Sequence, residues 1–299
     1  MTVALAAPGR PVDVARERRS NLMELSGHLP VVAGVSGSPA SLRAVREAAR
    51  EAEAHGCPLR LVHVFDWAPT SAGRPEHPGD LLQLARAEAD RAAPGLWVTT
   101  ELMEGNPVTA LIRASRRATL TVIGDGDLHD RDCLPAGATA VQVAARAAAT
   151  VMVARPSPAP GGPLLVGIGD APADHLLDFA FGAAARRHTP LVAVHVGDAP
   201  ERAAALRDAV AAYAEATGVE AELRVFDGDP AEVLRREARG ASLTVVGARG
   251  TLPYQGMLGA VTQTLLHHGR GPLAILRGAR PVVMRHLDAL AGALSGSRR

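Results

Sequence analysis

The 299-residue chain contains the same pattern twice, which limits the folds open to it more than any other feature. Residues 105–124 read GNPVTALIRASRRATLTVIG and residues 228–247 read GDPAEVLRREARGASLTVVG, with ten of 20 positions identical in a gapless alignment. Two further pairs, PVVAGVSGSPAS with PLLVGIGDAPAD and PLRLVHVFD with PLVAVHVGD, recur at offsets of 133 and 132 residues. A period of this length indicates two copies of a whole domain rather than a solenoid of short repeats.

The boundary between the copies is predicted in SPAPGGP, residues 157–163, because Pro and Gly continue neither a helix nor a sheet ladder. After the second copy, apolar residues recur at helical spacing, which predicts a helical tail. The predicted division is a flexible N-terminal segment (1–27), a first domain (28–156), a second domain (163–278) and a C-terminal tail (279–299).

Each copy alternates short apolar runs with segments of helical period. Runs rich in Val, Leu and Ile and bounded by Gly or Pro are typical of buried parallel strands. Within Ser41–His55, Leu42 and Val45 fall on one side of a helix, and Arg43 and Arg46 fall on another. The predicted strands of the first copy are Val31–Val35, Leu59–Phe65, Thr119–Ile123 and Thr150–Ala154.

Strands separated by helices imply right-handed crossovers and a parallel sheet covered by helices on both faces. We expect five strands and four helices in alternation in each copy. The predicted fold class is therefore α/β, with two tandem doubly wound, Rossmann-like parallel-sheet domains.

Composition excludes several classes of function. The 32 Arg and Lys nearly balance the 31 Asp and Glu, and a net charge of +1 argues against a broad nucleic-acid or membrane surface. Two cysteines, Cys57 and Cys133, are too few for a disulfide framework or a zinc site. The N-terminus has the wrong order of apolar and charged residues for a secretory signal, and no apolar run reaches the ~18 residues of a membrane span. We expect a cytoplasmic protein that binds neither nucleic acid nor membrane.

Arginine pairs and two histidines have structural interpretations. The arginine pairs on the predicted helices are interpreted as solvated faces that pair with nearby Glu and Asp. His63 and His195, at equivalent places near the end of the second strand of each copy, are interpreted as hydrogen-bonded structural residues, because the pattern places no Ser or Cys partner nearby. The arginine pairs are Arg116–Arg117, Arg186–Arg187 and Arg235–Arg236.

A candidate anion site follows the fourth strand of the second copy. Ligands of a doubly wound sheet bind beyond the carboxyl ends of the strands, where the strand order reverses. Here the chain reads TVVGARG and then TLPYQGMLGAVTQTLLHH. Glycines let the backbone approach a ligand and aim N–H groups at an anion, and the next helix adds its positive end. Arg249 could add a cation over phosphate oxygens.

The ordered motifs resemble the universal stress protein family. They are VVAGVSGSPAS, RLVHV, the GxPxxxLxxxA pattern, TVVGARG, GAVTQTLLHH and a last strand closing in Arg. The resemblance covers about Pro30–Pro156 and Pro163–Gly278, so the chain is similar to a tandem-domain member of the family. It implies a domain of the adenine-nucleotide-binding type. In such a domain the phosphates are held by a loop that consists of G-x-x-G, a spacer of nine residues and then G-[ST]. An Asp after the first strand and backbone atoms after the second hold the nucleoside.

The resemblance implies a site in the second copy with three departures from the family pattern. The loop spacer is eight residues, one short, and Ala260 stands where Ser or Thr is expected. Gly169 holds the place of the family Asp, with Asp170 directly after it. Losing one hydroxyl bond to a charged phosphate removes roughly 1.5–3 kcal/mol, about one to two decades of affinity. The implied cofactor-binding residues are Ile168, Gly169, Asp170, Val196, Gly247, Arg249, Gly250, Gly259, Ala260, Val261 and Thr262.

The loop of the first copy reads GDGDLHDRDCLPAGATAVQV and is acidic. Four carboxylates crowd the place where a triphosphate would sit, and each like-charge pair at ~4 Å costs about 1 kcal/mol in water. Ala138 replaces Ser or Thr, and Ser36 replaces the Asp after the first strand. Metal binding is an alternative use of these carboxylates, although the spacing lacks the closing Glu of a calcium loop. The carboxylates are Asp125, Asp127, Asp130 and Asp132.

The family also pairs the last strand of its sheet with another copy, and a bare edge is a liability. We expect Thr150–Ala154 and Pro272–Leu276 to satisfy each other, which gives an intrachain pseudo-dimer that could dimerise further. The first functional hypothesis is a non-enzymatic stress-response protein that binds ATP, with Mg²⁺, or another adenine nucleotide in its C-terminal domain. The second is an interaction module of the same fold without a nucleotide. The third is a slow ATPase or a nucleotide-activating transferase, for which Asp170 is the one nearby base.

Overall fold

The computed structural model describes residues 29–65, 78–126, 134–169, 174–248 and 258–277. The two copies have the same order of strands and helices. The first copy comprises β1 (Val31–Val35), α2 (Pro39–Ala54), β2 (Leu59–Phe65), α3 (Pro78–Ala92), β3 (Val98–Glu104), α4 (Pro107–Ser115), β4 (Leu120–Gly124), α5 (Thr139–Arg146) and β5 (Thr150–Ala154). The second comprises β6 (Leu164–Ile168), α6 (Asp174–Arg187), β7 (Leu191–Val196), α7 (Pro200–Thr217), β8 (Ala221–Phe226), α8 (Pro230–Glu237), the 3-10 helix η1 (Ala238–Gly240), β9 (Leu243–Gly247), α9 (Ala260–His268) and β10 (Leu273–Leu276).

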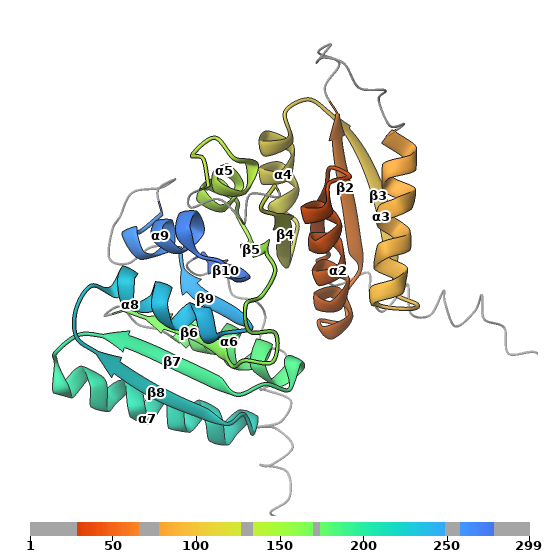
Figure 1. Ribbon diagram of the computed structural model, residues 1–299. Coiled ribbons are helices and arrows are strands. Elements are labelled where there is room, and N and C mark those ends of the chain that lie inside the picture. Colours follow the sequence, from red (N-terminus) through yellow and green to blue (C-terminus); the bar gives the residue numbers. More distant parts are fainter. Residues whose placement is uncertain (1–28, 66–77, 127–133, 170–173, 249–257, 278–299) are drawn as a thin grey trace, which may run out of the picture.

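All ten strands of the described residues form one sheet, in the order β3-β2-β1-β4-β5-β10-β9-β6-β7-β8. Pairing within each copy is parallel, and the central pair β5–β10 is antiparallel, with Val151 opposite Ile275 and Val153 opposite Leu273. Figure 1 shows β5 and β10 side by side between the two halves of the molecule. The expected pairing of the two edges, and with it the intrachain pseudo-dimer, is confirmed.

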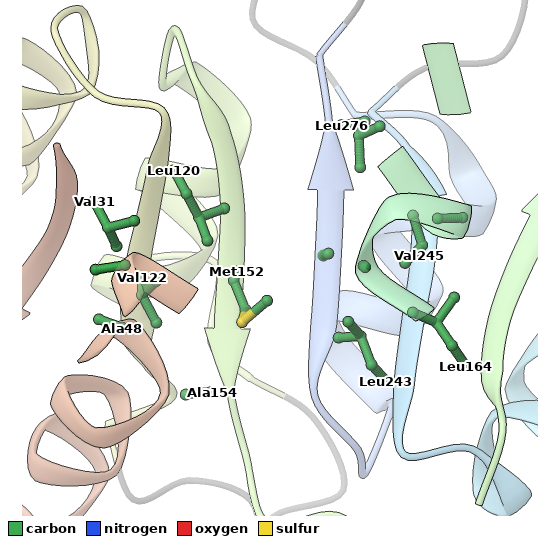
Figure 2. Close-up of a cluster of buried hydrophobic side chains, with 14 of the residues drawn as sticks. Val31, Ala48, Leu120, Val122, Met152, Ala154, Leu164, Leu243, Val245 and Leu276 are labelled. Atoms are coloured by element: carbon green, nitrogen blue, oxygen red, sulfur yellow. The ribbon is translucent and has the colours of Figure 1, made fainter. Parts of the chain in front are cut away.

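Alternate residues of each strand enter cores on opposite faces of the sheet. Met152 and Ala154 of β5 belong to the core beneath α2, α3, α6 and α7. Val151 and Val153 belong to the core beneath α4, α5, α8 and α9. Each core runs through both copies, and Figure 2 shows Met152 of the first copy and Val245 of the second in the same cluster. Continuous apolar strands of this kind require a sheet buried on both faces.

Local chemistry fixes where several helices start. Ser38, Asn106 and Asp229 each accept backbone N–H bonds at the start of α2, α4 and α8, and Pro occupies the first turn of each. Helix α7 ends at Gly218, whose φ of 68° lies in the left-handed region. Helix α2 begins at Pro39, two residues before the segment Ser41–His55 in which the sequence pattern predicted a helix.

Buried charge joins the copies above the central strands. Arg187 of α6 pairs with Glu51 of α2, and Glu51 is 4% exposed. The interpretation of Arg186–Arg187 as a solvated face with nearby partners was therefore wrong for Arg187, because its partner comes from the other copy. Burial lowers the pKa of Arg186, while the charge of Glu51 opposes that change.

Two predicted strands have slightly different bounds in the structure, and two predicted segments lie outside the described residues. The fourth strand is Leu120–Gly124, one residue later than predicted, and the last is Leu273–Leu276. The N-terminal segment 1–27 and the tail 279–299 lie outside the described residues. Among the helices that the structure describes, none has the length and apolar character to cross a bilayer.

Candidate functional site

The strand order reverses beside β6 in the second copy. Strand β6 lies between β9 and β7, so that the carboxyl ends of the three strands meet at one edge. Ile168 pairs with His195 on β7, and Gly167 pairs with Val246 on β9. Three predicted site residues, Ile168, Val196 and Gly247, therefore end adjacent strands at the point where such sheets bind ligands.

The start of α9 faces this edge without a side-chain cap. Gly259 is its N-cap, and its N–H donates to Ala248 O over 2.9 Å. The first intrahelical bond of this turn runs from the N–H of Gln263 to Gly259 O, so the N–H groups of Ala260, Val261 and Thr262 precede it. Uncapped N–H groups and the positive end of the helix dipole make this a place for an anion.

Thr262 holds the two ends of the loop together. Its side chain is 2% exposed, and Oγ1 donates to the carbonyl of Gly247 over 2.6 Å. Since the hydroxyl carries one proton, that proton is used within the protein. Thr262 therefore positions the end of β9 against α9.

The carbonyls at the end of β6 are engaged as well. The ring Nδ1 of His195 lies 3.0 Å from Ile168 O, and Arg202 Nη2 donates to Gly169 O over 3.1 Å. In the first copy His63 Nδ1 lies 2.8 Å from Val35 O. A carbonyl can only accept, so each Nδ1 carries the proton. Both histidines are hydrogen-bonded structural residues, as the sequence indicated.

Three of the predicted site residues, Asp170, Arg249 and Gly250, lie outside the described residues. The loop residues Asp127, Asp130 and Asp132 of the first copy lie outside them too. Within the described ranges no group of His, Cys, Asp and Glu is arranged to hold a metal ion.

The first copy has a cavity of about 300 Å³ at the equivalent edge of the sheet. Hydrophobic side chains of β1, β2, β4 and α4 form part of its wall, and serines after β1 form another. A cavity of this size is at the lower end of the range for small-molecule sites. Its lining includes Val35, Ser36, Ser38, Val62, Leu111 and Asp125.

Asp125 differs from the sequence-based expectation of an exposed repulsive charge. Its side chain is fully buried, with Arg155 Nε 4.0 Å from Oδ2 and Arg43 Nη1 3.9 Å from Oδ1. Two guanidinium groups therefore oppose this one carboxylate. The acidic loop repels an anion less than a count of its carboxylates suggests, because Asp125 is compensated inside the protein.

Arg155 also connects this carboxylate to the second copy. Its Nη1 donates to Leu265 O over 3.2 Å and to Gly269 O over 2.9 Å, and its Nη2 donates to Leu266 O. Burial lowers the pKa of Arg155 to about 10, and the charge of Asp125 opposes that change. Sequence reasoning missed this link, although the arginine that closes the last strand was a visible signal.

The second copy makes part of the same contact with the first copy. Arg277, after β10, donates to Ala144 O near the end of α5 in the first copy. The position equivalent to Asp125 is Ala248, which is buried and uncharged. The two copies thus share the arginine contact and differ in the charge at the start of the loop.

Comparison with known proteins matches both copies to one family. The profile described as "Universal stress protein family" matches residues 29–155 and 197–277. A universal stress protein of Mycolicibacterium smegmatis is 30% identical over 285 residues, which cover 83% of this chain and 96% of that protein. Universal stress protein Rv2623 of Mycobacterium tuberculosis is 30% identical over 296 residues, with the same shares covered.

Solved structures agree on the fold. A universal stress protein from Archaeoglobus fulgidus superposes with a TM-score of 0.63 at 15% identity, covering 84% of this chain and 97% of that chain. The duplicated sheet, the motif order and relatives matched along almost their whole length lead to one assignment: the chain belongs to the universal stress protein family.

Proposed function

We propose that this chain is a non-enzymatic, cytoplasmic stress-response protein that binds an adenine nucleotide, ATP with Mg²⁺, in its second copy. The observation that carries the proposal is the uncapped start of α9 beside Gly247. There the N–H groups of Ala260, Val261 and Thr262 precede the first intrahelical bond. Phosphates are the ligands that such helix starts favour.

The charge at the start of each loop supports a preference for the second copy. Ala248 follows the glycine that ends β9, whereas Asp125 follows the glycine that ends β4. Asp125 places a carboxylate on the wall of the first cavity, which Arg43 and Arg155 compensate in part, whereas Ala248 carries no charge. A triphosphate in the first cavity would face that carboxylate in a poorly solvated site.

The nucleoside would lie across the ends of β6 and β7. Ile168, Gly169 and Val196 offer backbone atoms there, and Asp170 is the proposed ribose partner. Arg249 and Gly250 complete the proposed phosphate loop. Because Ala260 lacks a hydroxyl, we expect affinity about one to two decades below that of a loop with Ser or Thr.

Calorimetric titration with ATP and Mg²⁺ tests the proposal. The chain should bind one nucleotide, and Gly250→Asp and Arg249→Glu should each abolish binding. Gly137→Asp is the matched control in the first copy, because a Cβ at Gly137 meets nothing within 4 Å. It should leave the affinity within about twofold, less than the ~0.5 kcal/mol typical of a neutral surface change.

Three outcomes would contradict the proposal. Absence of binding at millimolar ATP would favour the interaction module without a nucleotide. Loss of binding in Gly137→Asp, with binding retained in Gly250→Asp, would place the nucleotide in the first copy. Turnover of ATP that Asp170→Ala removes would show a slow ATPase instead.

A further inference from the structure

A groove lies between α8 and α9, at the end of α9 opposite to the proposed nucleotide loop. It encloses about 520 Å³, within the range of small-molecule sites. Figure 1 shows α8 and α9 as neighbours, and Val233, Leu234 and Leu265 fill the core beneath them. The groove is lined by Asp229, Ala231, Glu232, Arg235, Ala238, Arg239, Thr264, His268, Arg270 and Gly271.

Positive charge gathers at one end of this groove. Arg235 and Arg239 come from α8 and η1, and Arg270 comes from the turn after α9. The two carboxylates, Asp229 and Glu232, lie toward the start of α8, where Asp229 Oδ1 already accepts the N–H of Ala231 over 2.8 Å. The groove is therefore cationic at the end formed by Arg235, Arg239 and Arg270.

The carboxylate of Glu237, the last residue of α8, is already engaged in ion pairs. Glu237 pairs with Arg236 Nε at 3.0 Å and with Arg224 Nη1 at 3.5 Å. Among the described residues, Arg235 and Arg239 have no carboxylate within 4.0 Å, the limit for an ion pair. Their guanidinium groups are left for water or a ligand.

The first copy provides an internal comparison, because the repeat gives each groove position an equivalent. Ile112 stands where the second copy has Arg235, and Ala148 stands where it has Arg270. Arg116 is equivalent to Arg239. The same helix pair thus folds without two of the three arginines.

One wall of the groove is held rigidly from behind. Arg155 donates to Leu265 O and Gly269 O in the last turn of α9, next to Thr264 and Arg270. Cations held on a fixed wall lose less conformational entropy when an anion binds. The guanidinium fork also matches phosphate and carboxylate oxygens in pairs.

We propose that this groove binds a small polyanion, a compound with two or more phosphate or carboxylate groups, held between Arg235, Arg239 and Arg270. The site is separate from the nucleotide loop and does not depend on it. Glu232 at the opposite end gives the groove a preference for ligands that carry their charge at one end.

The test titrates the chain with pyrophosphate, and in a second arm with citrate, at low salt. Gly250→Asp serves as the background, so that the phosphate loop takes no part. We expect saturable binding that weakens at least about tenfold in Arg235→Ile/Arg270→Ala, which restores the residues of the first copy. Arg116→Ala is the matched control and should change the affinity less than about twofold. The two arms distinguish phosphate from carboxylate ligands.

ATP binding by Arg235→Ile/Arg270→Ala in the otherwise unchanged chain should stay as it was, which separates this proposal from the proposed function. Circular dichroism checks that the variant is folded. Equal binding of both probes by the variant and its background would overturn the proposal, as would no saturable binding of either probe at millimolar concentration.

Discussion

Arg187 Nη2 of the second copy lies 2.5 Å from Glu51 Oε1 of the first. His55 Nε2 lies 3.5 Å from Oε2 of the same carboxylate. Burial would raise the pKa of Glu51, but the contact with His55 and the charge and hydrogen bond of Arg187 outweigh it and lower the pKa from 4.5 to about 2. The contact between the copies therefore depends on an ionised Glu51.

Acid should weaken the protein through this residue. The folded pKa lies below the unfolded one, so the stabilisation is complete above pH 4.5 and is lost as the pH falls toward about 2. The difference corresponds to about 3 kcal/mol. Glu51→Gln should lower the free energy of unfolding at pH 7 by up to that amount and flatten its dependence on pH in this window, measured by urea denaturation.

Glu47→Gln is the control for this prediction, because Glu47 pairs with Arg50 on its own helix. It should change stability by less than about 0.5 kcal/mol. A wild-type and a Glu51→Gln protein with parallel pH profiles would contradict the role given to Glu51.

Removing Arg155 should be costly. Arg155→Met leaves the carboxylate of Asp125 and the carbonyls of Leu265 and Gly269 without this guanidinium. Breaking a buried pair from one side costs about 3–5 kcal/mol. In a double-mutant cycle by chemical denaturation, Asp125→Asn should recover part of that loss. Strict additivity of the two changes would show that the residues are not coupled.

Gly124 is required by a close backbone contact. A Cβ there would lie 2.6 Å from the carbonyl carbon and oxygen of Ala40, whereas one at Gly137 meets nothing within 4 Å. Gly124→Ala should destabilise the protein by roughly 1–3 kcal/mol, and Gly137→Ala should not. Thermal unfolding of the two variants measures this, and equal melting temperatures would refute it.

Thr262 should affect both stability and the proposed site. Thr262→Val leaves Gly247 O without its hydroxyl donor in a buried position, which costs about 1–3 kcal/mol. Nucleotide affinity should fall with it, because α9 is no longer tied to β9. Thr262→Ser keeps the hydroxyl and loses only the methyl group, so it should retain more of both properties than Thr262→Val. A Thr262→Val protein as stable as the wild type would contradict the role given to the hydroxyl.

The repeat and its local patterns predicted most of the fold. β1 and β2 each begin directly after a Pro, and their bounds Val31–Val35 and Leu59–Phe65 are those predicted from the apolar runs. The β5–β10 pair followed from the need to cover two bare edges. Ser38 was predictable as a cap because capping depends on neighbours in the sequence.

The charge network could not be predicted in this way. Glu51 and Arg187 are separated by 136 residues, and Arg155 and Leu265 by 110. Such pairs depend on how the two copies dock, which no local pattern encodes. For the same reason Asp125 was predicted as one more exposed acid, although two guanidinium groups from α2 and the end of β5 face it.

The most direct measurement is a crystal structure of the chain grown with ATP and Mg²⁺. Electron density for the triphosphate at the start of α9, between Gly247 and Gly259, is the result we predict, with the first cavity free of nucleotide. A triphosphate bound beside Ser36 and Asp125 instead would contradict the claim that the second copy holds the nucleotide.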